Sequence, residues 1–273
     1  MKYNLLSNYK LFLVSLGLRP NTINTYYNRM AKLLEGHYLT NGCSKIDVSS
    51  LITKLSNIHY KNHFSQSKNA LLYFCKCYQI SITNKQLKDI ERLQKQTRKK
   101  YRKSTKTEYP KIKRTIDRLK NKKLKVSYLT MIETGLRVSE LSQIKVSDCM
   151  VSNEKICFSF IGKGGKKAFS TISKKDNTPL YVCLKDTILY YRDKGLDSKK
   201  LFYSSQYLQQ KAKLYGFSCL DLRRISAKLE YKKSKSKHQV RNKLRHAKIK
   251  TTYIYLNSPV KMKDTITIRG EFK

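Results

Sequence analysis

Apolar residues in the first hundred positions recur at the spacing of helices that bury one face. One stripe follows Pro20, a residue suited to the first turn of a helix, and a second begins at Phe64. The two stripes are Ile23, Tyr26, Met30, Leu33 and Leu34, then Phe64, Leu71, Phe74, Cys75 and Tyr78. Because the aromatic residues among them keep helical spacing, we expect core packing and not a stacking surface. The pattern predicts a lobe of short helices.

The second half of the chain changes from helix to strand and back. After Pro110 the helical spacing resumes, and between positions 155 and 173 Ile156, Phe158 and Phe160 alternate with more polar residues until a glycine-rich break. Such alternation around a glycine break predicts a β-hairpin. Further helices are expected at 179–193, 204–214, 218–231, 237–246 and 249–257. The fold class is therefore mostly α with a small antiparallel sheet.

A strongly basic stretch lies between these two halves. Seven basic residues and no acidic one occur between Lys95 and Lys106, a composition that cannot bury a core. A chain of 273 residues is long enough for two domains. We expect a helical domain over 1–98, a linker over 99–109 and a second domain over 110–273. The linker is either a solvated strap or a segment that binds a polyanion through Lys99, Lys100, Arg102 and Lys103.

The net charge narrows the choice of partner. Lys and Arg number 59 against 18 Asp and Glu, a formal charge of +41. Such self-repulsion is tolerated best when phosphates neutralise it, so nucleic acid is the favoured partner. A membrane surface would also attract a basic chain, but no run of about 18 apolar residues exists. Polar residues interrupt the first twenty positions, which predict an amphipathic helix and not a signal peptide.

The cysteines indicate neither a disulfide framework nor a metal site. They number seven and include no C-x-x-C pair. We interpret them as reduced core thiols of a cytoplasmic protein, and no metal is expected.

Arginine, histidine and tyrosine residues in the second domain form a pattern with chemical meaning. The stretch T-G-L-R-V-S-E-L puts Arg137 where one helix ends and another starts, Arg223 follows Asp221 and Leu222, and Tyr255 comes nine residues after His246. A planar arginine fork binds two phosphate oxygens at once and stays charged. Nearby cations also lower the cost, roughly 4 kcal/mol at neutral pH, of turning a tyrosine into a phenolate nucleophile.

In order and spacing, these boxes resemble those of the tyrosine recombinases, the phage integrase and Xer family. The resemblance includes a Gly-Lys-Gly hairpin around Lys163 and the separation of 23 residues between Arg223 and His246. The stretch from Leu18 to Tyr26 is similar to the opening of the family's core-binding domain, so the resemblance covers nearly the whole chain. It implies a two-domain clamp around double-stranded DNA, with a core-binding (SAM-like) helical domain and an α-rich catalytic domain.

The same resemblance implies site-specific strand exchange. Arg137 and Arg223 would hold the scissile phosphate, and Tyr255 would attack it to give a 3′-phosphotyrosyl bond. His246 would bond the phosphate or assist proton transfer, and Lys163 would protonate the departing 5′ oxygen. No metal or ATP would be needed.

Two further expectations follow from the family. Glu140, three residues after Arg137, would hold that arginine in place. The family works as a tetramer on two DNA sites, and the tail from Leu256 to Lys273 could pack on a neighbouring protomer.

Some residues compete for these roles. Tyr253 lies two positions before Tyr255, about 200° around a helix, so only one of them can face the phosphate, and the spacing from His246 favours Tyr255. Lys166 and Lys167 are alternatives to Lys163. Since nine residues on one helix would put His246 and Tyr255 on opposite faces, we expect a bend near 247–250 and a helix start near position 251.

Two positions depart from the family pattern. Leu220 stands where the second arginine box usually has a histidine, so a proton-exchanging group is missing, and Arg224 could supply charge there instead. Arg245 replaces the glycine that usually precedes the box histidine, which removes an easy left-handed cap and could add a phosphate contact.

The catalytic boxes are surrounded by basic residues. Ten occur between Lys228 and Lys250, opposed only by Glu230. The alternatives are a solvated face and a surface that follows the DNA backbone. We favour the second for Arg241 and Arg245, together with Arg224.

Three other functions would explain part of this pattern. A type IB topoisomerase uses nearly the same residues, a non-catalytic DNA-binding relative would keep the charge without the tyrosine, and an RNA-coating protein would explain only the lysine content. The target site, and the choice among integration, excision, inversion and dimer resolution, stay open.

Overall fold

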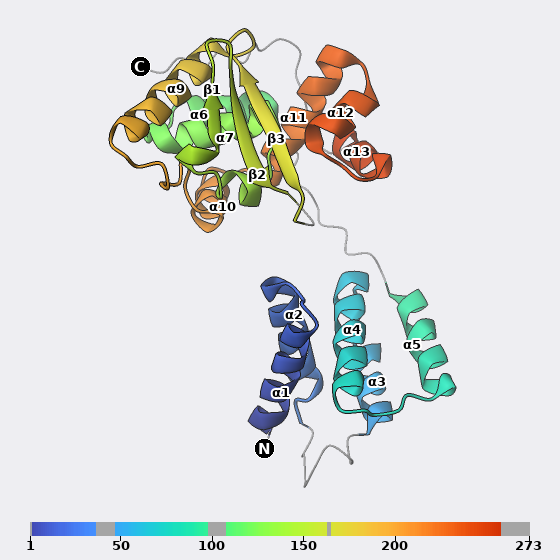
Figure 1. Cartoon of the computed structure of the whole chain (residues 1–273). Coiled ribbons are helices and arrows are strands. Elements are labelled where there is room, and N and C mark those ends of the chain that lie inside the picture. The colour runs from blue at the N-terminus through green and yellow to red at the C-terminus, as the bar shows by residue number, and fades with distance from the viewer. Residues whose placement is uncertain (1, 37–46, 98–107, 163–164, 258–273) are drawn as a thin grey trace. The chain divides into compact units, whose positions relative to one another are not determined.

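The computed structural model describes residues 2–36, 47–97, 108–162 and 165–257 (Figure 1). The chain divides into two compact units, Met1–Lys103 and Ser104–Lys273. The division falls inside the stretch expected to be a linker. Each unit has its own hydrophobic core.

The first unit consists of helices only. They are α1 (Lys2–Ser15), α2 (Pro20–Leu33), α3 (Val48–Ser56), α4 (Lys61–Cys77) and α5 (Asn84–Gln96). The two predicted stripes face the core, with only Tyr26 and Tyr78 partly exposed. The Tyr9 hydroxyl donates a 2.8 Å hydrogen bond to the carbonyl of Ala70, which joins α1 to α4. Core packing of the aromatic residues is therefore confirmed.

The second unit combines helices with one small sheet. Its elements are α6 (Tyr109–Asp117), α7 (Lys122–Thr134), α8 (Val138–Leu141), a 3-10 turn (Val146–Asp148), β1 (Cys149–Val151), β2 (Lys155–Ile161), β3 (Lys167–Ser173), α9 (Thr178–Asp193), α10 (Ser205–Leu214), α11 (Cys219–Ser234), α12 (Lys237–Leu244) and α13 (Ile249–Leu256). The strands run antiparallel in the order β1-β2-β3, with Phe158 opposite Ser170. The predicted fold class, mostly helical with a small antiparallel sheet, is confirmed.

Helix α7 forms the centre of the second unit. It is buried almost all round, with Tyr128, Leu129 and Met131 fully enclosed. It packs against α11 on one side and against α9 and β3 on others. The Tyr128 hydroxyl donates to the carbonyl of Leu208, which fixes α10 against α7. This helix therefore supplies a rigid base for the residues that follow it.

The expected break between His246 and Tyr255 is present. Helix α12 ends at Leu244 and α13 begins at Ile249, two residues before the expected start. The prediction that α12 reaches His246 was therefore two residues too long, because Arg245 adopts a left-handed conformation with φ of 54° and ends the helix. Strand β1 was not predicted, since three residues are too few to show alternation.

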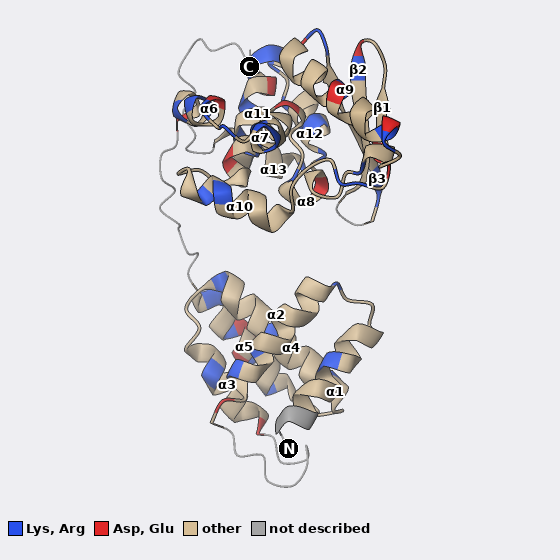
Figure 2. Cartoon of the chain, turned by 90° about the vertical axis from the view of Figure 1, so that its left-hand side faces the viewer, with Lys and Arg blue, Asp and Glu red and all other residues tan. Residues whose placement is uncertain are grey.

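Basic side chains occur on helices of both units, and acidic ones are much fewer (Figure 2). None of the helices in the described part of the chain is long and apolar enough to cross a membrane.

Candidate active site

The site begins at the junction of α7 and α8. Gly135 ends α7 in a left-handed conformation, with φ of 63°. A Cβ atom at this position would come within 2.5 Å of Leu244 Cδ2 and 3.0 Å of Ser226 Oγ, so any other residue would have to displace these side chains of α12 and α11 as well as adopt the left-handed backbone. The turn places Arg137 at the N-cap of α8.

Glu140 holds Arg137 at two points. Its Oε2 accepts the backbone N–H of Arg137 at 2.8 Å, and its Oε1 lies 2.5 Å from Arg137 Nη1. Burial alone would raise the pKa of this carboxyl, but hydrogen bonds from Arg137 and the charges of Arg137 and Arg245 lower it below its ordinary value. Glu140 is therefore an anion at neutral pH. The Arg137 side chain keeps 31% of its surface exposed and can reach a ligand.

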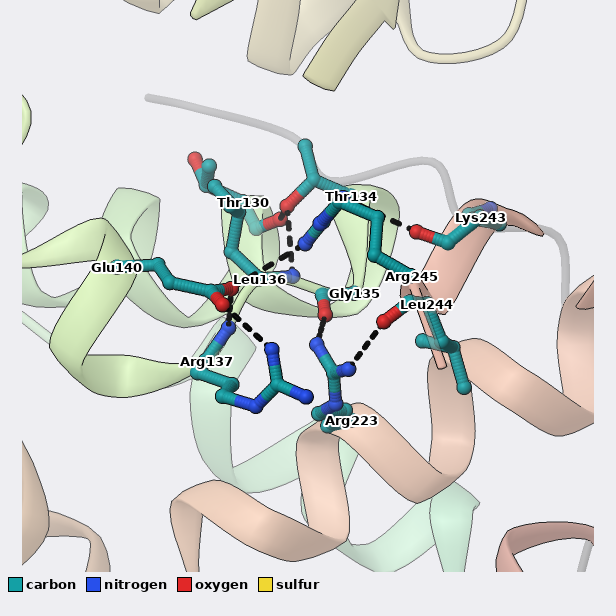
Figure 3. A network of polar contacts seen from close by, with 10 residues as sticks. All are labelled: Thr130, Thr134, Gly135, Leu136, Arg137, Glu140, Arg223, Lys243, Leu244 and Arg245. Atoms are coloured by element: carbon teal, nitrogen blue, oxygen red, sulfur yellow. Dashed lines mark hydrogen bonds and ion pairs between the residues drawn. The ribbon is translucent and has the colours of Figure 1, made fainter. Parts of the chain in front are cut away.

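Arg223 is a fully buried cation on α11, 2% exposed. Its two terminal nitrogens donate to the carbonyl oxygens of Gly135 and Leu244, which end α7 and α12 (Figure 3). Burial and the nearby charge of Arg137 lower its pKa to about 10, so it remains charged at pH 7. Its Nε has no hydrogen-bond partner among the described residues. A buried, charged donor without a partner favours an anion as the missing ligand.

His246 and Tyr255 lie against each other and close to Arg223. The two ring centroids are 4.7 Å apart, and Arg223 Cζ lies 5.9 Å from the Tyr255 ring centroid. His246 Nδ1 lies 3.0 Å from the hydroxyl of Thr252, whereas its buried Nε2 has no partner in the described part of the chain. Burial and then the charges of Arg223, Arg137 and Arg245 lower the pKa of His246 to about 4. The imidazole is therefore neutral at pH 7.

A cavity of about 620 Å³ opens onto the two arginines and Tyr255, whereas His246 is not among the residues that line it. Arg137, Arg223 and Tyr255 line it, together with Leu220 and residues of α10. Leu220 is 44% exposed and gives the cavity an apolar wall where the family pattern has a histidine. Four of the predicted site residues, Arg137, Arg223, His246 and Tyr255, are thus gathered in one place from three separate stretches of sequence.

Tyr253 points away from this cluster. It is 42% exposed, and Lys237 Nζ lies 4.8 Å above its ring. It does not line the cavity that Tyr255 lines. The geometry agrees with the choice of Tyr255 as the candidate nucleophile.

The remaining predicted residues have varied positions. Lys163 and the linker residues Lys99, Lys100, Arg102 and Lys103 lie outside the described residues. Arg224 pairs with Asp221 at 3.0 Å. Arg241 donates to the carbonyls of His246 and Ala247 and so supports the turn between α12 and α13. Arg245 points into the protein, where its Nη2 lies 3.3 Å from Glu140 Oε2.

Two features of the site were not identified from sequence. Thr252 is completely buried and contacts His246, and Gly135 permits the close approach of α12. The left-handed turn that Gly135 provides could have been expected from a glycine at a helix end, whereas no sequence signal points to Thr252.

The second unit matches a known protein family. The model of the phage integrase family matches residues 102–261. Lambda integrase, as a dimer bound to a COC' core site, has a TM-score of 0.65 and 18% identity, covering 98% of this chain and 99% of that chain. It also matches as a tetramer bound to a Holliday junction, with a TM-score of 0.63.

Two other solved structures share the fold. XerH recombinase bound to its difH substrate has a TM-score of 0.58 and 18% identity, covering 86% of this chain and 75% of that chain. The Tn1549 transposon integrase in complex with transposon right end DNA has a TM-score of 0.57 and 14% identity, covering 93% and 95%. No curated protein sequence matches the chain.

Fold and site together define the class of the tyrosine recombinases. The family model covers more than half of the sequence, and the chain belongs to the phage integrase family. The predicted resemblance and the predicted class of enzyme, a tyrosine-type site-specific DNA recombinase, are confirmed, and the three alternative functions are not favoured.

Proposed function

We propose that this protein cuts and rejoins double-stranded DNA at specific sites through a transient bond to Tyr255. The observation that carries the proposal is that two of the buried nitrogens without partners among the described residues, Arg223 Nε and His246 Nε2, lie in this site. Both belong to side chains that lie beside the Tyr255 ring. A phosphodiester held in the cavity beside Arg137, Arg223 and Tyr255 would bring an anion close to both nitrogens and its phosphorus to the phenol, although His246 does not itself line the cavity.

The proposed reaction transfers a phosphoryl group to Tyr255, and the new phosphotyrosyl bond conserves the energy of the broken phosphodiester bond. Tyr255 Oη gives up its proton to solvent as it attacks phosphorus, the bond from phosphorus to the 5′ oxygen breaks, and a 3′-phosphotyrosyl link forms. Negative charge grows on the non-bridging oxygens, where Arg137 and Arg223 stabilise it. The imidazole of His246 is neutral, so it can form a hydrogen bond to the phosphate through Nε2 without adding another positive charge to the crowded site. Lys163 protonates the departing 5′ oxygen, and Glu140 orients Arg137.

Rejoining requires a second DNA end, so we propose that the active form is a tetramer on two DNA sites. Lambda integrase in its tetramer on a Holliday junction shares the fold of this chain and supports this assembly. The basic surface near the site, including Arg224 and Arg241, and the basic linker contact the DNA backbone. We place the reaction in the cytoplasm, where the six described cysteines, which form no disulfide, stay reduced.

A suicide DNA substrate tests the proposal. Such a substrate carries a nick near the cleavage position, so the short 5′ product diffuses away and the covalent adduct accumulates. We expect wild-type protein to form an adduct that survives denaturing electrophoresis. Tyr255→Phe should form none while binding the same DNA, and Tyr253→Phe should form it normally. An adduct with Tyr255→Phe that disappears with Tyr253→Phe would overturn the assignment.

A further inference from the structure

Arg245 adopts a backbone conformation that side chains normally avoid. Its φ of 54° and ψ of 45° lie in the left-handed region, at the C-cap of α12. Glycine adopts this region at little cost, whereas other residues are strained there. A strained residue next to a candidate catalytic histidine is a reason to ask what its side chain does.

The side chain of Arg245 is directed inward and connects three elements. Its Nη1 donates to the carbonyl of Lys243 at 3.0 Å, and its Nη2 pairs with Glu140 Oε2 on α8 at 3.3 Å. Its Cζ lies 4.9 Å from the ring centroid of Phe160 on β2. The side chain is 21% exposed. These contacts direct the guanidinium toward Glu140 and Phe160, while its buried Nε has no hydrogen-bond partner among the described residues.

Glu140 shares its two oxygens between two arginines. Oε1 bonds Arg137 Nη1, and Oε2 bonds both the Arg137 backbone and Arg245 (Figure 3). The carboxylate is therefore held from both sides, and it can rotate only if the contact with Arg245 breaks. Phe160, the other partner of Arg245, lies two residues before Gly162, where β2 leads into the hairpin that carries Lys163.

We propose that Arg245 is a positioning residue of the active site. It locks Glu140, and through Glu140 it fixes the guanidinium of Arg137. Its cation–π contact with the Phe160 ring also holds the end of β2 close to Arg245 and Glu140. This role rests on the proposed function and differs from the phosphate contact expected from sequence, in which the guanidinium would face the DNA.

A pair of variants separates the side chain from the backbone. Arg245→Gly and Arg245→Ala both remove the guanidinium, but only the glycine relieves the left-handed conformation. If the guanidinium positions Arg137, both variants should lose adduct formation, by about tenfold to a hundredfold, because small misplacements in a site cost this much. If Arg245 merely shapes the turn before His246, Arg245→Gly should keep the wild-type rate and only Arg245→Ala should lose it, which would overturn the proposal.

DNA binding distinguishes positioning from a phosphate contact. The salt dependence of binding should be the same for Arg245→Gly and wild type, because no phosphate contact is removed. A slope of log K against log salt that falls by about 1 would indicate a direct phosphate contact and would overturn the proposal. Gln79→Gly is the matched control, since exposed Gln79 also has a left-handed backbone, with φ of 53°. Its adduct rate should equal that of wild type.

A double-mutant cycle tests whether Arg245 acts through Glu140. Glu140→Gln should lower the rate on its own, and adding Arg245→Gly should then cost much less than it costs in wild type. Losses that multiply independently would show that Arg245 does not act through Glu140.

If wild type itself forms no adduct, the proposed function fails. If wild type and Arg245→Gly form it equally, only the positioning role fails.

Discussion

At the scale of single residues, the chain concentrates positive charge around one carboxylate. Arg137, Arg223 and Arg245 would repel one another without the buried anion of Glu140, and a neutral His246 keeps the sum from rising further. The pKa of His246 is lowered, whereas a neighbouring carboxylate would raise the pKa of a histidine. The three arginines and the one carboxylate leave the site with a surplus of positive charge before DNA arrives, and a phosphodiester anion would offset part of it.

Thr252 should control the orientation of His246. Thr252→Val removes the hydroxyl that lies 3.0 Å from His246 Nδ1 and leaves that nitrogen buried without a partner. We expect a loss of about 1–3 kcal/mol in the free energy of unfolding. Adduct formation on the suicide substrate should also fall, because the ring can turn. Thr252→Ser keeps the hydroxyl and should retain most of the activity, and equal losses in the two variants would contradict the role.

The sequence predicted Arg137, Arg223, His246 and Tyr255 as a group through the resemblance of their boxes, in order and spacing, to those of the tyrosine recombinases. It could not show which way a long side chain turns. Arg245 was expected to face DNA, and its inward direction depends on Phe160 and Glu140, which approach it only in the folded unit. Thr252 was missed because it contacts His246 only once the turn before α13 has folded back onto that helix.

At the scale of elements, the ends of helices build the site. Arg137 lies at the start of α8, the carbonyls that hold Arg223 end α7 and α12, and Arg245 caps α12. The helices α9 to α13 were predicted from the sequence with ends within three residues of those observed. Their mutual approach at Gly135 was not, because it depends on the side chains of Ser226 and Leu244.

Gly135→Ala tests how closely these elements must pack. The added methyl group would meet Leu244 Cδ2, and the left-handed backbone would be strained as well. We expect a destabilisation of about 2–4 kcal/mol, the sum of a left-handed alanine and an overpacked core. Urea unfolding followed by circular dichroism measures it. Gly195→Ala is the control, because it has a similar φ of 65° but nothing within 4 Å of the added atom.

At the scale of the whole molecule, each chain carries its own candidate nucleophile and its own cations. Tyr255 lies against Arg223 of the same chain, and α13 packs on α11 and α12. A protomer should therefore cut DNA with its own tyrosine.

Mixing two inactive variants tests this expectation. Tyr255→Phe lacks the nucleophile, and Arg223→Ala lacks a phosphate-binding cation. If each site is built from one chain, the mixture should form no adduct on the suicide substrate. An adduct on the Arg223→Ala chain in the mixture would show that the tyrosine is delivered to a neighbouring protomer.

Because two carbonyls from distant helices hold Arg223, the active site is complete only when the second unit has folded. The guanidinium reaches its place only after α7 and α12, more than a hundred positions apart in the chain, have both docked on α11. A nascent or partly unfolded molecule would still bear most of its positive charge and could coat DNA, but it would lack the assembled centre. We therefore expect partly folded molecules to bind DNA without cutting it.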